Sequence, residues 1–166
     1  MIKSGFRGFA AVMLAGAVAS LPVPARAASL ESEIEMLRSD LKTQKVEIVK
    51  ETVNVEGATA DAFWPLYRKY QAELDQLTDK RLAMIKDYAA NYDHLTGDKA
   101  KALVKQALDL QSQRAALLKK YYPQFEKVVG PVSAVNLIQV EHLIMAMVDV
   151  QIGANMPVAA DKMTGK

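Results

Sequence analysis

The 166-residue chain contains no cysteine. This absence excludes a disulfide-stabilised scaffold, a zinc or iron–sulfur site with cysteine ligands, and a catalytic thiol. Hydrophobic residues make up 51% of the chain and charged residues 24%, which is the balance of a globular protein and not of a disordered one. Because a domain averages roughly 150 residues, the length indicates a single domain.

Histidine and the short motifs of catalysis are also scarce. His94 and His142 are the only histidines, and the sequence has no phosphate loop, no glycine-flanked serine and no paired-histidine zinc motif. Glu31, Glu33 and Glu35 lie where a helix is expected to begin, and they suit its positive end better than they suit an acid–base pair. We therefore expect no enzymatic activity and no cofactor.

Long apolar runs are missing except near the start of the chain. Residues 8–21 form an apolar stretch that is too short for a hydrocarbon core, which needs about 20 residues. Lys3 and Arg7 precede this stretch, and a small-residue site ending at Ala27 follows it, as in a secretory signal peptide. We predict that residues 1–27 are removed and that the protein is periplasmic. An uncleaved membrane anchor is the alternative.

The net charge of +2 also depends on this segment. The segment holds three of the 21 basic residues and none of the 19 acidic ones, so the rest of the chain carries 18 basic against 19 acidic side chains, a net charge of −1. A nucleic-acid-binding protein needs a basic face. We therefore expect no nucleic-acid partner. Because the only long apolar run is removed with the signal segment, we also expect no stable insertion in a membrane after cleavage.

Glycine and proline are sparse after the signal segment, and the stretches between them repeat apolar residues at spacings of three and four. This period predicts an all-α fold, since no segment alternates as a strand does. We expect one helical domain over 28–156 and a disordered tail over 157–166. The predicted helices cover about 30–52, about 57–92, a stretch that begins after the 93–98 turn, and a last stretch that starts at Gly130-Pro131 and runs to about 155.

Local signals refine these helices. Thr96 fits the N-cap of the third helix, and Pro65 should kink the second helix or lie near its start. Pro123 should bend the third helix. The first helix carries a heptad seam with one polar break, formed by Leu30, Ile34, Leu37, Leu41, Gln44 and Ile48.

The apolar seams of the second and third helices match when the chain folds back at the 93–98 turn. Pairing positions whose numbers sum to 191 aligns eight layers, from Phe63 with Val128 to Tyr88 with Leu103. This register predicts a long antiparallel helical hairpin. Such a hairpin has little core of its own, so the flanking N- and C-terminal helices or a second subunit must cover it.

Two arginines, Arg81 and Arg114, interrupt these seams. In the same register the candidate partner of Arg81 is Asp109, and that of Arg114 is Asp75 or Glu73. We interpret them as structural ion pairs that fix the register, because a buried charge without a partner is strongly destabilising. Contact with an anion or a client on an exposed hairpin face is the alternative.

The fourth helix is apolar on most of its circumference. Its polar residues, among them Asn136, Gln139, Glu141 and His142, argue against a membrane span. A helix of this kind is usually buried in a core or in an interface. We therefore expect a homodimer to which this helix contributes.

Two short segments mix basic and aromatic residues, and the predicted register brings them to the same end of the hairpin. They are Tyr67-Arg68-Lys69-Tyr70 and Lys119-Lys120-Tyr121-Tyr122. One interpretation is a surface that binds clients or partners. The other is a solvated helix face whose tyrosines belong to the core.

A metal site is a weaker possibility. His142, Met145 and Asp149 share a helical face at i, i+3 and i+7, and a histidine with a thioether could hold copper(I). Methionine on so apolar a helix is more often a core residue. We expect no native metal site and keep these three residues as weak candidates.

The signal segment and the long hairpin resemble those of the Spy/CpxP-type periplasmic helical proteins. Val53–Thr59 lies where that family carries its first leucine-threonine-x-x-glutamine motif, and Val129–Ser133 lies at the second; by residue, only Pro131 matches well. The family includes ATP-independent chaperones, envelope-stress modulators and metal-sensing relatives. The resemblance implies a cradle-shaped antiparallel dimer that binds unfolded clients.

The chain resembles more closely a group of uncharacterised exported bacterial proteins with a phenylalanine-tryptophan-proline-x-tyrosine motif, here residues 63–67. Tyr92–Thr96 and the stretch 139–158 match other patterns of that group. We predict an ATP-independent chaperone or envelope-stress protein that binds unfolded or partner proteins. A non-catalytic structural or regulatory interaction module is the alternative, and a metal-sensing role is a lesser one.

Overall fold

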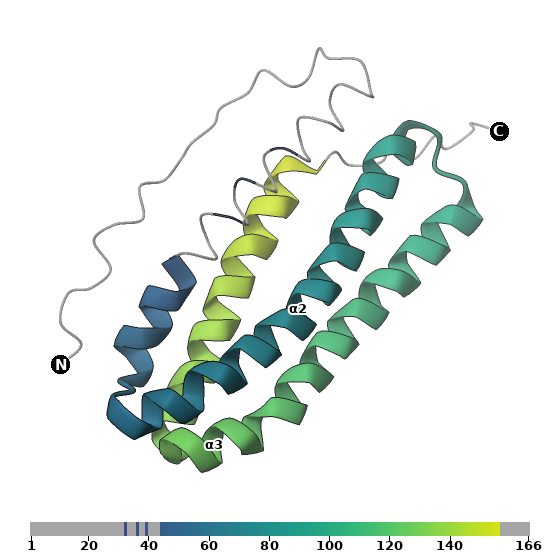
Figure 1. The fold of residues 1–166 in the computed structure, drawn as a ribbon. Helices are drawn as coiled ribbons and strands as arrows, with labels where there is room; N and C mark the ends of the chain where they lie inside the picture. Colours follow the sequence, from purple (N-terminus) through teal and green to yellow (C-terminus); the bar gives the residue numbers. More distant parts are fainter. Residues whose placement is uncertain (1–31, 33–35, 37–38, 40–43, 157–166) are drawn as a thin grey trace.

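The computed structural model describes residues 32, 36, 39 and 44–156 (Figure 1). The predicted signal peptide at 1–27, the predicted tail at 157–166 and the part of the heptad seam before residue 44 lie outside the described residues. Within them the chain forms helices joined by short turns and no strand, which confirms the predicted all-α class.

Among the described residues, helix α2 (Gly57–Asn91) is the first long element, and its bounds agree with the predicted 57–92. A shorter helical stretch, 44–53, precedes it and is followed by Asn54, whose φ of 49° is a left-handed conformation that asparagine tolerates after a helix. Pro65 lies inside α2. The helix begins well before this proline, so Pro65 does not mark its start.

A short 3-10 turn, η2 (Tyr92–His94), leads from α2 into helix α3 (Gly97–Asn155). The predicted N-cap is confirmed, because the Thr96 hydroxyl accepts a hydrogen bond from the Lys99 N–H at 3.3 Å. Within α3, Gly130 alone leaves helical geometry, with φ 80° and ψ 165°, a conformation open to glycine because it has no Cβ. The chain reverses there (Figure 1), so we describe α3 as a 97–129 arm and a 131–155 arm.

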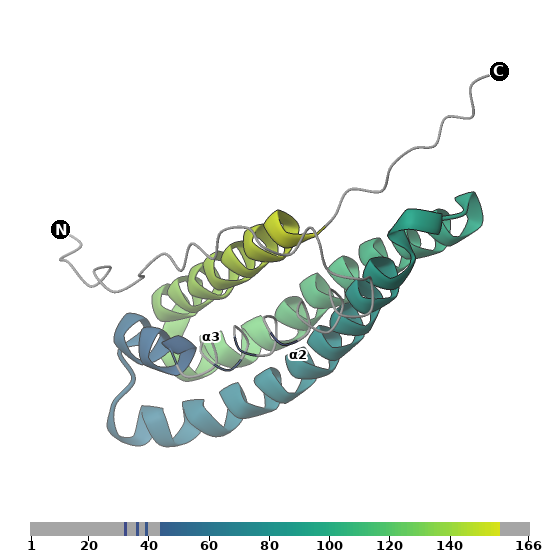
Figure 2. The same cartoon turned by 90° about the horizontal axis from the view of Figure 1, so that it is seen from above.

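The long helical stretches run alongside one another (Figures 1 and 2). The main core lies at the end where α2 begins and is rich in aromatic rings. Tyr70 meets Tyr121 edge-on with ring centroids 5.5 Å apart, a layer that the register predicted. Phe125, which the predicted seam omitted, contacts Phe63 at 5.8 Å between centroids. A smaller cluster lies towards the other end and contains Ile85, Ala89 and Ile152.

The 44–53 stretch is helical as predicted, but it buries a different face. Lys45, Val49 and Val53 are buried, whereas Gln44 is exposed and Ile48 is half-buried. The predicted seam ran through Gln44 and Ile48 and did not include Lys45. The reason for the shift is that a carboxylate of the 131–155 arm receives the Lys45 ammonium inside the fold.

Candidate functional site

The carboxylate of Glu141, on the 131–155 arm, is almost completely buried, with 1% of the residue exposed. Its Oε2 lies 2.7 Å from the Lys45 Nζ and 3.0 Å from the Tyr70 hydroxyl. Its Oε1 lies 2.9 Å from the Tyr67 hydroxyl and 3.3 Å from the Gln71 Nε2. Lys45 also donates to the Gln71 side-chain oxygen at 3.2 Å. We call these five residues the clasp, because they join the 44–53 stretch, α2 and the 131–155 arm.

The spacing of the clasp residues follows from helix geometry. Tyr67, Tyr70 and Gln71 stand at i, i+3 and i+4 of α2, so they share one face and reach the same carboxylate. Burial raises the pKa of both tyrosines, and the negative charge of Glu141 raises their pKa further. Both hydroxyls therefore stay protonated and serve as donors. Because each of these side chains has hydrogen-bond partners within the clasp, the clasp fixes the arrangement of three segments.

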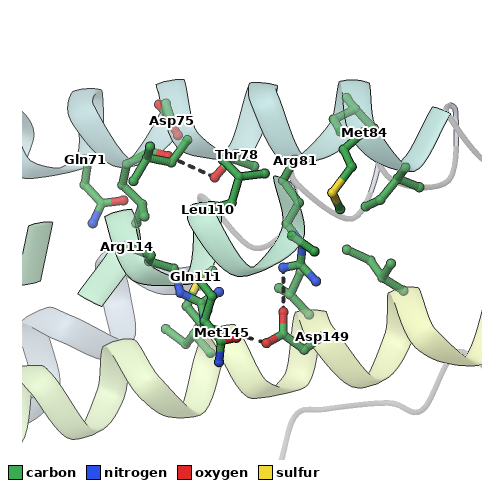
Figure 3. A pocket seen from close by; sticks show the side chains of 18 of the residues that line it. Gln71, Asp75, Thr78, Arg81, Met84, Leu110, Gln111, Arg114, Met145 and Asp149 are labelled. Carbon is green, nitrogen blue, oxygen red and sulfur yellow. Dashed lines mark hydrogen bonds and ion pairs between the residues drawn. The ribbon is translucent and has the colours of Figure 1, made fainter. Parts of the chain in front are cut away.

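A second polar cluster links α2 to both arms of α3. Arg81 Nη1 lies 2.5 Å from Asp149 Oδ1, and Arg114 Nη2 lies 3.7 Å from Asp149 Oδ2. Figure 3 shows the three side chains converging from α2, the 97–129 arm and the 131–155 arm. We call them the arginine triad.

The triad corrects the predicted ion pairs, which assigned Arg81 to Asp109 and Arg114 to Asp75 or Glu73. Asp109 pairs with Lys105 on its own helix at 2.5 Å, and Asp149 takes its place beside Arg81. The predicted register paired only α2 with the 97–129 arm. The returning 131–155 arm supplies an acid that this register did not contain.

A groove of about 350 Å³ lies between α2 and the two arms of α3 (Figure 3). It extends from Lys45 and Gln71 at the clasp, past the arginine triad, to Ile85 and Ile152. Most of its wall is aliphatic. The apolar residues that line it are Leu74, Leu77, Leu82, Met84, Ile85, Ala107, Leu110, Ile144, Met145, Val148 and Ile152.

The structure removes three aromatic rings from the predicted client surface, since Tyr67, Tyr70 and Tyr121 are buried in the core. Tyr122 is half-buried, and Arg68, Lys69, Lys119 and Lys120 are exposed. The reason is that the tyrosines occupy the core face of their helices, while the basic residues occupy the outer face.

One acidic residue ties two members of that surface to α2. Glu73 accepts hydrogen bonds from the Lys120 ammonium and from the Tyr121 hydroxyl, each at 2.7 Å. These two hydrogen bonds hold the pKa of Glu73 below its usual value. Burial, and then the Glu73 carboxylate, raise the pKa of Tyr121 to about 12.

The weak metal candidates His142, Met145 and Asp149 do not all line the groove. Met145 and Asp149 line the groove, whereas His142 is exposed and does not line it. Asp149 already faces two arginines. Among the residues that the structure describes, no group of three histidine, aspartate or glutamate side chains could hold a metal ion.

The outer face of the 131–155 arm is apolar and exposed. Val132 and Val150 are 74% and 73% exposed, and Val135 and Leu143 are 45% and 48% exposed. Ala146 and the polar Gln139 are also exposed on this face. We call Val132, Val135, Leu143, Ala146 and Val150 the stripe. The only charged residues from 131 to 155 are Glu141 and Asp149, which belong to the clasp and the triad.

Comparison of the chain with known protein families, with curated proteins and with solved structures finds no match in any of the three. By length and composition alone, α3 is apolar enough to cross a membrane, with a window of mean hydropathy 1.4 that is 28% buried. The core helix of a soluble protein passes the same test, although such a helix is mostly buried. In this fold Glu141 and Asp149 of α3 are held by ion pairs.

Sequence reasoning did not find the clasp or the groove. The signal for the clasp was available: Glu141 is a lone acid within an otherwise apolar stretch, and such a residue needs a cationic partner when its helix is buried. The identity of that partner was not available, because Lys45 lies 96 positions away.

Proposed function

We propose that the protein is an exported, periplasmic chaperone of the envelope-stress type that binds apolar segments of unfolded or partner proteins without ATP. The stripe on the 131–155 arm is the observation that carries this proposal. Exposed contiguous apolar surface marks interaction sites, whereas scattered apolar residues do not. In the proposal, the antiparallel hairpin of α2 and the 97–129 arm is the scaffold that supports this arm.

The occupant that fits the stripe is an extended segment of an unfolded polypeptide. The 131–155 arm is about 37 Å long at 1.5 Å per residue, a length that an extended segment of about eleven residues spans. The stripe has no charge that would have to be desolvated. Its width of one helix face is enough for a single strand of chain. The exposed Arg68, Lys69 and Lys119 remain candidate contacts for partners on another part of the surface.

Suppression of aggregation tests the proposal. The full chain is expressed, and the exported protein that it yields is added to thermally denatured citrate synthase. Light scattering is then followed without nucleotide. We expect suppression near equimolar ratio, and its loss in the double variant Val132→Lys with Val150→Lys. The matched control is Val104→Lys with Leu108→Lys, which changes two residues of similar exposure on the 97–129 arm.

Two results would reject the proposal. The first is continued aggregation at several-fold excess of the protein. The second is equal loss of suppression in the stripe variant and in the control variant, because charge anywhere on the surface would then explain the effect.

A homodimer that serves as a structural or regulatory module is the second candidate, and the order of residues in the stripe favours it. An antiparallel pairing with positions summing to 285 sets Val135 of each copy against Val150 of the other, so these two stripe residues meet twice across the interface. A stable interface buries about 800 Å² per partner, so neighbouring surface must contribute too. Sedimentation equilibrium that shows a dimer, abolished in the stripe variant and without suppression of aggregation, would favour this candidate.

A further inference from the structure

The groove is long and narrow. Gln71 and Ile85 line its two ends and are separated by about 21 Å along α2 at 1.5 Å per residue. A volume of about 350 Å³ over this length gives a mean cross-section on the order of 20 Å². That cross-section fits one extended hydrocarbon chain and excludes a helix, which is about 10–12 Å wide.

The volume of the groove also reaches that of a ligand site. Protein interiors leave few voids larger than a water molecule, whereas ligand sites begin at about 300 Å³ and are lined mainly by apolar side chains. Here the buried wall residues come from three helical stretches, with Leu74 and Ile85 on α2, Leu110 on the 97–129 arm and Ile144 on the 131–155 arm.

The charges beside the groove favour an anion. The Lys45 ammonium is neutralised by Glu141 at 2.7 Å, and Asp149 is engaged by Arg81 at 2.5 Å. Arg114 lies 3.7 Å from Asp149, which is beyond hydrogen-bond distance, and its side chain is 26% exposed. Asp75, the other acid on the lining, points away from the triad across α2 in Figure 3. The Arg114 guanidinium therefore keeps N–H donors for a further acceptor, and its fork suits a carboxylate.

We propose that the groove binds a single-chain amphiphile with a carboxylate head, of the fatty-acid class. The carboxylate lies on Arg114 beside the triad, and the hydrocarbon chain lies along the aliphatic wall. This site does not depend on the proposed chaperone function. The stripe occupies the opposite side of the 131–155 arm from Ile144, Val148 and Ile152, which line the groove.

Isothermal titration calorimetry of the exported protein with dodecanoate below its micellar concentration tests the site. Dodecanol provides the same chain without the charge, and acetate provides the carboxylate without the chain. We expect one dodecanoate per chain, no heat with acetate, and at least about tenfold weaker binding of dodecanol, because an alcohol forms no charge-assisted pair with Arg114.

Four variants test whether the ligand binds in the groove. Arg114→Gln should weaken dodecanoate about tenfold and leave dodecanol unchanged, whereas Arg68→Gln, at an exposed arginine outside the groove, should change neither. Met145→Trp should fill the groove and abolish binding of both. The stripe variant Val132→Lys with Val150→Lys should bind dodecanoate as the wild type does. Circular dichroism melting checks that each variant is folded.

Several outcomes would overturn the proposal. They are equal affinity for dodecanoate and dodecanol, a loss in Arg68→Gln as large as in Arg114→Gln, and no binding at all. Binding that does not saturate at one molecule per chain, or that disappears in the stripe variant, would place the amphiphile on the outer surface and would also reject the groove.

Discussion

Glu141→Gln should be one of the most destabilising single substitutions in this protein. The glutamine keeps the volume of the side chain but removes the charge that neutralises Lys45, whose side chain is 10% exposed. Loss of one partner from a buried ion pair costs about 3–5 kcal/mol. We expect the lower end, about 3 kcal/mol, because the new amide oxygen can still accept from a tyrosine and Gln71 still accepts from Lys45.

Urea unfolding followed by circular dichroism measures this loss. For a domain of this size, about 3 kcal/mol also lowers the melting temperature by roughly 10 °C. Adding Lys45→Met to Glu141→Gln removes the unpaired ammonium, so the double variant should recover at least about 1 kcal/mol over Glu141→Gln alone. Glu47→Gln, on the exposed face of the 44–53 stretch, is the control and should stay within about 0.5 kcal/mol of wild type.

The reasoning would be wrong if Glu141→Gln unfolded at the same urea concentration as Glu47→Gln. It would also be wrong if the double variant were less stable than Glu141→Gln, because the clasp would then not depend on the charge pair.

Two further predictions concern the backbone and the tyrosines. Gly130→Ala should destabilise the fold by about 1–3 kcal/mol in urea unfolding, because φ 80° with ψ 165° is open only to glycine, although nothing lies within 4 Å of the new Cβ. Gly153→Ala, in helical backbone, should instead stabilise the fold by about 0.4–1 kcal/mol. A Gly130→Ala variant as stable as the wild type would show that the backbone at this position is not strained. The pKa of Tyr121 is raised to about 12, so the stability that its protonated form provides is complete below pH 10 and is lost as the pH rises towards 12. The pKa values of Tyr67 and Tyr70 are raised as well, so the loss of stability from their ionisation continues above that pH. Tyrosinate absorbance and circular dichroism in one alkaline titration should show these three ionising together with loss of helix, and ionisation of all six tyrosines near pH 10 in folded protein would refute this.

The local features of the fold could be predicted from the sequence because local signals determine them. The bounds of α2, the N-cap Thr96 and the break at Gly130 each follow from a few neighbouring residues. The contact between Tyr70 and Tyr121 followed from matching two seams across one turn. Such matches depend only on helix period and on the position of the turn.

The candidate site could not be predicted, because it depends on how the 131–155 arm returns along the other helices. Asp149 reaches Arg81 and Arg114 only in that arrangement, whereas the two-helix register pointed to acids on the hairpin itself. Burial of Lys45 contradicts the usual exposure of lysine, and only its contact with Glu141 explains it. The groove is a volume left between three helical stretches, and no residue pattern in one of them encodes it.

The clasp has a consequence for the order of folding. Its ion pair joins residues 96 positions apart, whereas the contacts across η2 join neighbours in the chain. Contacts close in sequence form first, because they lose less chain entropy on closure. We therefore expect the clasp to close last, so the core face of the 44–53 stretch is among the last apolar surfaces to leave water. At high concentration, the folding intermediate should be the most aggregation-prone form of this protein.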